Sequence, residues 1–191
     1  ARGANPDPCR SRRPCHPQGV HPFGGSLLLR VEDTDRSRYD PHSLDDIVAS
    51  LQWLGLTWDE GPDIGGPHAP YVQSERLGGY QEAAERLLSG GHAYRCYCSS
   101  KRLSRLRDSG QIGYDRHCRH LTEEQRRTNE TRGAVSVVRL RVPDDGVISF
   151  EDGILGTVER AAEDITADPV LLKSDGFPTY HLAAIVDDAA M

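Results

Sequence analysis

The apolar residues of this chain follow two patterns, one typical of buried strands and the other of helices. Leu27, Leu28 and Leu29 form a continuous run with Val31 close behind, and such a short run predicts a strand buried on both faces, as in parallel sheets covered by helices. From Ser43 to Gly55 the spacing changes to that of one helical face. The apolar residues on this face are Leu44, Ile47, Val48, Leu51 and Leu54.

Polar residues mark the ends of the predicted helices. Ser43 and Asp46 have the spacing of a capping box, and Ser74 is expected to cap a second helix that ends at Gly90 and Gly91. The second helix has one apolar face, formed by Leu77, Tyr80, Ala84, Leu87 and Leu88. A strand followed by a helix, a loop and another helix predicts an α/β fold.

The remaining segments alternate between short strands and short helices. Residues 92–97 and 135–142 read as strands, Ser100 begins a short helix, and Thr122 with Gln125 forms another capping box. We therefore predict an inserted α+β subdomain over 93–163. A buried strand over 170–173 and a helix from about Tyr180 follow it. Residues 1–23 are rich in Pro, Arg, Gly and His and are expected to be irregular.

Composition narrows the class of protein. Of 191 residues, 27% are charged and 37% hydrophobic, and the net charge is −6, which indicates a soluble globular protein and argues against nucleic-acid binding by bulk charge alone. No apolar run approaches the ~18 residues of a membrane span, so we expect no membrane partner. Five cysteines, an odd number unevenly placed, favour a reduced compartment and a metal site over a disulfide framework.

Two short pairs of residues indicate where that metal would bind. Cys96 and Cys98 are followed, after nineteen residues, by Cys118 and His120, and thiolate and imidazole are the donors that zinc prefers in a closed tetrahedral site. Four protein ligands leave no open position, so the predicted zinc is structural. The competing interpretation is two unrelated reduced cysteines and a surface pair.

Three carboxylates follow the first predicted strand. Glu32, Asp33 and Asp35 stand just past its carboxyl end, where open α/β sheets bind ligands, although a solvated turn would look the same. The stretch Leu-Leu-Arg-Val-Glu-Asp-Thr-Asp, with Arg36 next, resembles glutamyl-tRNA synthetases. Two further segments resemble the same family: 61–77, with Gly-Pro-Asp-Ile-Gly-Gly-Pro and Gln-Ser-Glu-Arg, and 171–188, with Ser-Asp-Gly-Phe-Pro-Thr-Tyr-His-Leu. The resemblance covers about residues 24–188.

The resemblance implies a fold and a set of roles. It implies a partial Rossmann-like class I synthetase catalytic domain, formed by 24–92 and 164–191, with 93–163 as the inserted acceptor-binding subdomain. Glu32 would receive the ammonium of glutamate and Tyr180 would hydrogen-bond the amino acid, while Asp35 and Arg36 would lie near the acceptor end of the tRNA. The zinc ligands would be Cys96, Cys98 and Cys118, with His120 or Tyr114 as the fourth; His120 is preferred here because imidazole is the better neutral donor.

The implied activity is that of a glutamate–tRNA ligase acting on glutamate, ATP with Mg and tRNA(Glu), as a monomer. Neither the His-x-Gly-His signature of the family nor its Lys-Met-Ser-Lys-Ser signature is present, so we expect a fragment or isoform that does not aminoacylate alone and assign it no catalytic residue. Two alternatives remain: a non-catalytic zinc-containing tRNA-binding module, and a glutamyl-queuosine tRNA synthetase-like enzyme. The Arg-rich start favours the mitochondrial matrix, with the bacterial cytoplasm as the other expected location.

Overall fold

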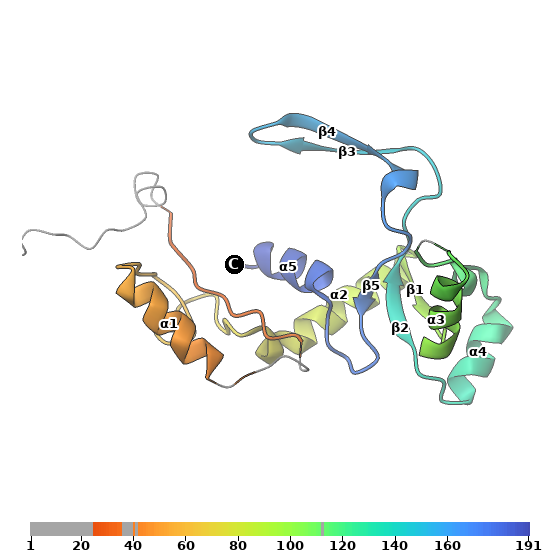
Figure 1. The fold of residues 1–191 in the computed structure, drawn as a ribbon, viewed down its shortest axis with the longest axis horizontal. Coiled ribbons are helices and arrows are strands. Elements are labelled where there is room, and N and C mark those ends of the chain that lie inside the picture. Colours follow the sequence, from red (N-terminus) through yellow and green to blue (C-terminus); the bar gives the residue numbers. More distant parts are fainter. Residues whose placement is uncertain (1–24, 36–39, 41, 112) are drawn as a thin grey trace, which may run out of the picture. The chain divides into compact units, whose positions relative to one another are not determined.

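A computed structural model describes residues 25–35, 40, 42–111 and 113–191 of the chain (Figure 1). The described residues fall into two compact units, one ending at Arg76 and the other spanning Leu77–Met191. No helix among these residues is long and apolar enough to cross a membrane. The irregular segment predicted over 1–23 lies outside the described residues, and the predicted subdomain boundaries stay a prediction.

The first unit contains one α-helix, α1 (Ser43–Trp53), among its described residues, followed by the 3₁₀ helix η2 (Gln73–Arg76). The predicted helix is therefore confirmed, but its predicted capping box is wrong. The N-cap is His42, without a side-chain cap, because the helix begins at Ser43 itself. Ser74 likewise lies inside η2 rather than at a helix cap.

The predicted buried strand at 27–31 takes a weaker form. Leu28 and Val31 make isolated parallel bridges to Glu60 and Val72, with backbone bonds such as Leu29 N to Glu60 O at 2.8 Å. The residues from Leu27 to Val31 are only half-buried. The prediction of a fully buried strand was wrong, because among the described residues this segment makes only isolated bridges and belongs to neither sheet.

The second unit is built on an antiparallel sheet of three strands, β1 (Ala93–Cys96), β2 (Val137–Leu140) and β5 (Val170–Leu172), in the order β1-β2-β5. In its register Ala93 faces Leu140 and Cys96 faces Val137, while Val138 faces Leu172. All three strands had been predicted. Two of these strands, β1 and β2, lie within the predicted insertion over 93–163, and β5 follows it, yet all three belong to one sheet.

Helices complete the second unit. They are α2 (Leu77–Ser89), α3 (Ser100–Asp108), the 3₁₀ helix η3 (His117–His120), α4 (Glu123–Thr131) and α5 (Tyr180–Asp188). The capping box of Thr122 and Gln125 at the start of α4 is confirmed. One core joins α2, β5 and α5 through Tyr80, Ala83, Ala84, Leu171, Leu182 and Ala183. This core anchors α5, whose first residue is Tyr180.

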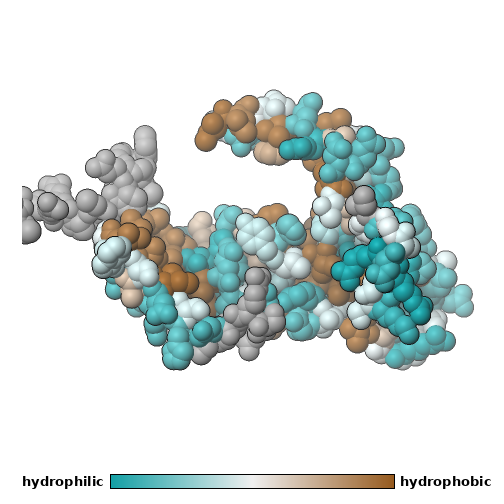
Figure 2. Space-filling view, viewed as in Figure 1, coloured by the Kyte–Doolittle hydropathy of each residue, from teal (hydrophilic) through white to brown (hydrophobic). Residues whose placement is uncertain are grey.

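The strands β3 (Val147–Asp152) and β4 (Gly156–Ala161) form a separate antiparallel hairpin, followed by the 3₁₀ helix η4 (Ala162–Asp164). The hairpin was not predicted, although Val147 to Phe150 is rich in β-formers. Its apolar side chains are exposed, including Ile154 at 94% and Leu155 at 76%. Figure 2 shows such apolar residues at the surface of the hairpin and of α1.

Candidate functional site

The acids that follow residues 27–31 line a pocket in the first unit. The pocket has a volume of about 720 Å³ and is bounded by residues 29–33 and by the first turns of α1. Both Glu32 and Asp35 line it, so the structure brings these two predicted site residues together. Arg36, the third residue predicted in this stretch, lies outside the described residues.

The pocket is strongly acidic. Its lining contains six carboxylates and a single basic side chain, Arg30, which donates to Glu32 Oε1 at 3.1 Å. Asp33 is fixed in place because its Oδ1 accepts a hydrogen bond from Ser74 N at 2.8 Å. A concave surface lined by one sign of charge raises the local concentration of the opposite charge, so this pocket favours a cationic group such as an ammonium.

Tyr180, the other predicted contact for the amino acid, opens α5 in the second unit. Its side chain is 63% exposed and its ring lies edge-on to that of His181, with centroids 6.0 Å apart. The preceding residue, Thr179, is held against β5, since its hydroxyl donates to Val170 O at 2.7 Å and its N–H to Leu171 O at 2.8 Å. Tyr180 is thus an accessible phenol on a well-anchored helix start. It belongs to a different unit from Glu32.

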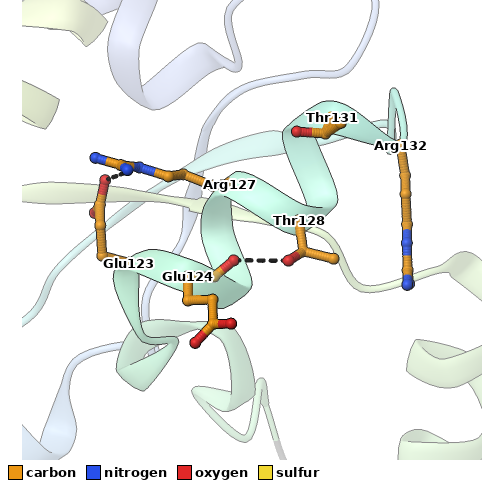
Figure 3. Close-up of a pocket in the computed structure, with 6 residues that line it drawn as sticks. All are labelled: Glu123, Glu124, Arg127, Thr128, Thr131 and Arg132. Carbon is orange, nitrogen blue, oxygen red and sulfur yellow. Dashed lines mark hydrogen bonds and ion pairs between the residues drawn. The ribbon is translucent and has the colours of Figure 1, made fainter.

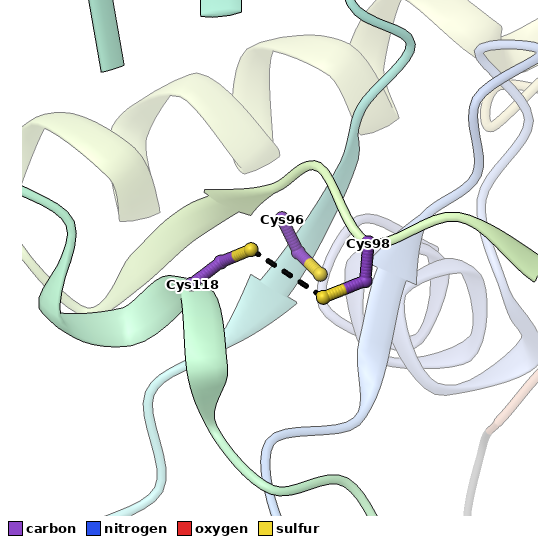
Figure 4. Close-up of side chains that lie close together, drawn as sticks. All are labelled: Cys96, Cys98 and Cys118. Carbon is purple, nitrogen blue, oxygen red and sulfur yellow. Dashed lines mark hydrogen bonds between the residues drawn. The ribbon is translucent and has the colours of Figure 1, made fainter. Parts of the chain in front are cut away.

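Three of the four predicted zinc ligands converge. The sulfur atoms of Cys96, Cys98 and Cys118 all lie within 4.8 Å of one another, and Figure 4 shows the three side chains pointing together from the end of β1, the following loop and η3. Cys98 Sγ and Cys118 Sγ are 3.5 Å apart. Three thiols at this spacing match the donor set of a thiolate-rich zinc site.

The side chain that lies beside the three sulfurs is Tyr114 rather than His120. The hydroxyl of Tyr114 lies 3.3 Å from Cys96 Sγ and 3.6 Å from Cys98 Sγ and accepts from Cys118 N at 2.9 Å. His120 is exposed and is not among the residues whose ligand atoms gather here. The reason is geometric: residues two apart in a 3₁₀ helix of three residues per turn project in different directions, so Cys118 and His120 cannot face one point from η3.

The surroundings of the cluster favour a thiolate. The pKa of Cys96 is lowered to about 4, mainly because the Cys118 thiol donates to it, with the Tyr114 hydroxyl contributing after that. The same hydrogen bond, together with burial, raises the pKa of Cys118. The guanidinium of Arg139 lies over the Tyr114 ring, 3.9 Å from its centroid, and Arg102 Nη1 lies 3.6 Å from Cys98 Sγ. Thiolates are the metal-binding form of cysteine, so these positive charges support metal binding.

A second depression, of about 390 Å³, lies on the surface of α4 and does not resemble a site. Figure 3 shows its six lining residues, all from α4 or its C-terminal end and all exposed. The polar contacts drawn there are local to the helix, from Arg127 to Glu123 and from the Thr128 hydroxyl to Glu124 O. Exposed i,i+4 pairs of this kind contribute little energy and present no enclosed volume to a ligand.

Sequence reasoning missed a buried polar group in the first unit. Glu60 is only 7% exposed, and its Oε2 lies 2.5 Å from the Tyr71 hydroxyl and 2.8 Å from His68 Nδ1. These hydrogen bonds lower the pKa of Glu60. A β-carbon at Gly66 would lie 2.8 Å from Glu60 Cγ, so the glycine is required here. The adjacent glycines Gly65 and Gly66 of the 61–67 motif were the available signal, but they do not reveal their partners.

Comparisons with known proteins agree on one family. A family model described as tRNA synthetases class I (E and Q), catalytic domain, matches residues 20–191. The glutamate–tRNA ligase of Borreliella burgdorferi is 50% identical over 173 residues, which are 88% of this chain and 35% of that protein. That of Acidothermus cellulolyticus is also 50% identical over 173 residues, covering 88% and 34%.

Solved structures give the same result. A glutamate tRNA ligase from Elizabethkingia meningosepticum, crystallised in complex with its amino acid, superposes with a TM-score of 0.80 at 36% identity and covers 88% of this chain and 36% of that chain. The glutamate–tRNA synthetase of Elizabethkingia anophelis superposes with a TM-score of 0.81 at 36% identity, again covering 88% of this chain and 36% of that chain. The chain therefore spans about a third of the length of the relatives it matches.

Proposed function

We propose that this chain, which belongs to the family of class I tRNA synthetases for glutamate and glutamine, is part of a glutamate–tRNA ligase. This part would receive the amino acid and carry a metal-bearing insertion. The observation that carries this proposal is the pocket whose wall contains Glu32 and Asp35, within a chain half identical to glutamate–tRNA ligases. The whole ligase would activate glutamate with ATP and Mg and transfer it to tRNA(Glu).

The roles of the residues follow from their chemistry. Glu32 is suited to the ammonium of glutamate because a carboxylate forms short, charge-assisted hydrogen bonds with a cation. Tyr180 is suited to the bound amino acid because its exposed phenol can donate or accept. Asp35 and Arg36 would lie at the acceptor end of the tRNA. The chemistry itself depends on positioning and on groups that stabilise the phosphates.

The metal in this proposal is a structural zinc. Cys96, Cys98 and Cys118 would supply three thiolates and Tyr114 the fourth ligand, since its hydroxyl already contacts two of the sulfurs. A zinc ion with four protein ligands would contribute folding energy to the second unit rather than chemistry. The small cluster of buried residues around it, which includes Tyr94, supports this role.

The remaining features of the proposal concern the whole protein. We take the ligase to act as a monomer, without a membrane partner, in either of the two locations predicted from the sequence. The mitochondrial matrix is supported by the Arg-rich segment 1–23, and the bacterial cytoplasm by the bacterial source of the relatives named above. Fractionation of cells from the source would decide between them.

The test uses the complete protein that contains this chain. Glu32→Gln should raise the KM for glutamate by about 10- to 100-fold, since a hydrogen bond to a charged group contributes roughly 1.5–3 kcal/mol, and it should leave tRNA binding unchanged. Glu82→Gln, at an exposed acid of α2 that does not line the pocket, is the matched control. A complete protein that binds tRNA but never charges it would instead support the non-catalytic module.

A further inference from the structure

Asp168 is a completely enclosed carboxylate of the second unit. It is 0% exposed, and its backbone has φ +44°, a left-handed conformation that is uncommon for a residue other than glycine. Its Oδ2 accepts from the Tyr94 hydroxyl at 2.7 Å, and its Oδ1 accepts from Val142 N at 3.0 Å and from Arg119 Nη1 at 3.3 Å. A buried carboxylate that accepts from three donors is held firmly in one position.

Arg119 is a buried cationic partner of the Asp168 carboxylate. Its side chain is 5% exposed, and Nη1 also donates to Val142 O at 2.8 Å, while Nη2 donates to Asp144 Oδ2 at 3.1 Å. The guanidinium therefore contacts residues at both ends of the segment 143–167: Val142 and Asp144 at its start and Asp168 just after its end. A planar fork of five donors suits such simultaneous contacts, which a lysine ammonium cannot reproduce.

The segment 143–167, here called the arm, contains β3, β4 and η4. Val142 stands immediately before it and Asp168 immediately after it, and the hydrogen bond between them closes its base. The sheet pairing of the arm is internal, as β3 and β4 pair with each other alone among the described strands. The contacts at the base of the arm therefore largely determine the position of its exposed apolar tip, which is formed by Ile154 and Leu155.

The base of the arm is also joined to the thiol cluster. Arg119 follows Cys118 directly in η3, so any ligand that fixes the Cys118 backbone also fixes the start of the Arg119 side chain. A second link runs from Arg139, which donates to Asp168 O at 2.7 Å and stacks on Tyr114. Two routes therefore connect the candidate metal ligands with Asp168: Arg119 reaches its carboxylate and Arg139 reaches its backbone carbonyl.

We propose that Asp168 and Arg119 are positioning residues that clamp the base of the arm, and that metal binding by Cys96, Cys98 and Cys118 narrows the range of arm orientations through this clamp. The metal half of this inference rests on the proposed function. The clamp itself does not, since it is formed by contacts within the chain. A merely structural role would alter the stability of the unit without making the arm respond to the metal.

The experiment measures the arm directly in the full chain. Genetically encoded, non-cysteine spin labels at Ile154 and at Glu124, both exposed, give a distance distribution by pulsed EPR, with zinc added or removed by a chelator. Cobalt absorption of the same proteins reports separately whether the thiolates bind metal. The variants are Asp168→Asn and Arg119→Lys, so that one remains if the other does not fold. Glu85→Gln, which removes the charge of an exposed partner of Arg95, is the matched control.

We expect zinc to narrow the distance distribution of the wild type and of Glu85→Gln, and both clamp variants to lose this narrowing while keeping the cobalt–thiolate bands. Clamp variants that keep those bands and still narrow with zinc would overturn the proposal. A wild type without cobalt–thiolate bands would contradict the proposed metal site and the metal half of this inference. The clamp would then be judged on the chelated proteins, where an identical distribution for wild type and Asp168→Asn would refute it.

Discussion

The hydroxyl of Tyr80 on α2 lies 3.0 Å and 2.8 Å from the two carboxylate oxygens of Asp187 on α5, and both residues are completely buried. These residues are 107 positions apart in the chain. The contact therefore ties the end of α5 to a helix formed much earlier in the sequence. Because α5 begins at Tyr180, this bond helps to hold the helix that carries the proposed amino-acid contact.

Tyr80→Phe should lower the free energy of unfolding by about 1–3 kcal/mol, because it removes a donor from a buried carboxylate while keeping the ring. Urea unfolding followed by circular dichroism measures this change. Tyr97→Phe is the control, since its hydroxyl contacts the exposed Glu130 at 3.3 Å, and it should cost less than about 1 kcal/mol. Equal losses in the two variants would mean that burial of the Tyr80 contact adds nothing.

The core beneath the same helix gives a second prediction. Leu171 is 5% exposed and packs between α2 and α5, whereas Ile185, on α5, is 72% exposed. Leu171→Ala should therefore destabilise the protein by about 2–5 kcal/mol, the range for a leucine removed from a core, and Ile185→Ala by no more than about 0.5 kcal/mol. Thermal unfolding of the two variants checks the contrast, and a larger loss for Ile185→Ala would contradict this packing.

Much of the fold could be predicted from local patterns because several elements are specified by their own residues. The capping box of Thr122 and Gln125 needs no distant partner, and the apolar run at 170–172 lies between turn residues that end it. The resemblance to glutamyl-tRNA synthetases, and with it the class of fold, is confirmed by the family match and the solved structures. Local signals of this kind survive whatever packs around them.

Elements that depend on neighbours were predicted less well. The run from Leu27 to Val31 indicated a fully buried strand, yet it is half-buried and makes isolated bridges. The hairpin of β3 and β4 escaped prediction because its apolar residues, such as Phe150, face solvent instead of a core. Ser43 had the right partner spacing for a capping box, but spacing alone does not fix the residue at which a helix starts.

The candidate sites show the same division. The spacing of Cys96, Cys98 and Cys118 predicted the thiol cluster, which the structure brings together. Tyr114 had been the second choice because imidazole is the better neutral donor, whereas the positions of the two side chains around η3 favour Tyr114. Asp168 gave no sequence signal, since an aspartate before a proline reads as a turn. Its role depends on partners 26 to 74 residues away.

The proposed metal centre can be tested ligand by ligand. Cys98→Ser should weaken cobalt and zinc binding more than about tenfold because it removes a soft donor, whereas His120→Ala should leave the affinity and the cobalt spectrum unchanged. Tyr114→Phe should bind the metal but shift the cobalt bands, as the fourth ligand is replaced by water. Titrations with a competing chelator provide the affinities. Loss of binding in His120→Ala would restore that residue as the fourth ligand.

The pair of Arg102 and Asp115 lies beside the thiol cluster and should make its contribution to stability depend on pH. Arg102 donates to both carboxylate oxygens, one at 3.1 Å, and this lowers the pKa of Asp115 below its ordinary value. A carboxyl whose folded pKa is depressed stabilises the fold above its unfolded pKa of about 3.9. That stabilisation is lost as the pH falls from there through the folded pKa.

A double-mutant cycle of Arg102→Gln and Asp115→Asn separates this effect from the titration of the nearby thiols. The coupling free energy should be about 1 kcal/mol at pH 7, because both side chains are partly exposed to water, and should fall toward zero as the pH drops below about 3.9. Urea unfolding of the four proteins at several pH values, all with a chelator present, measures it. A coupling that stays constant down to low pH would show that the contact does not depend on the charge of Asp115.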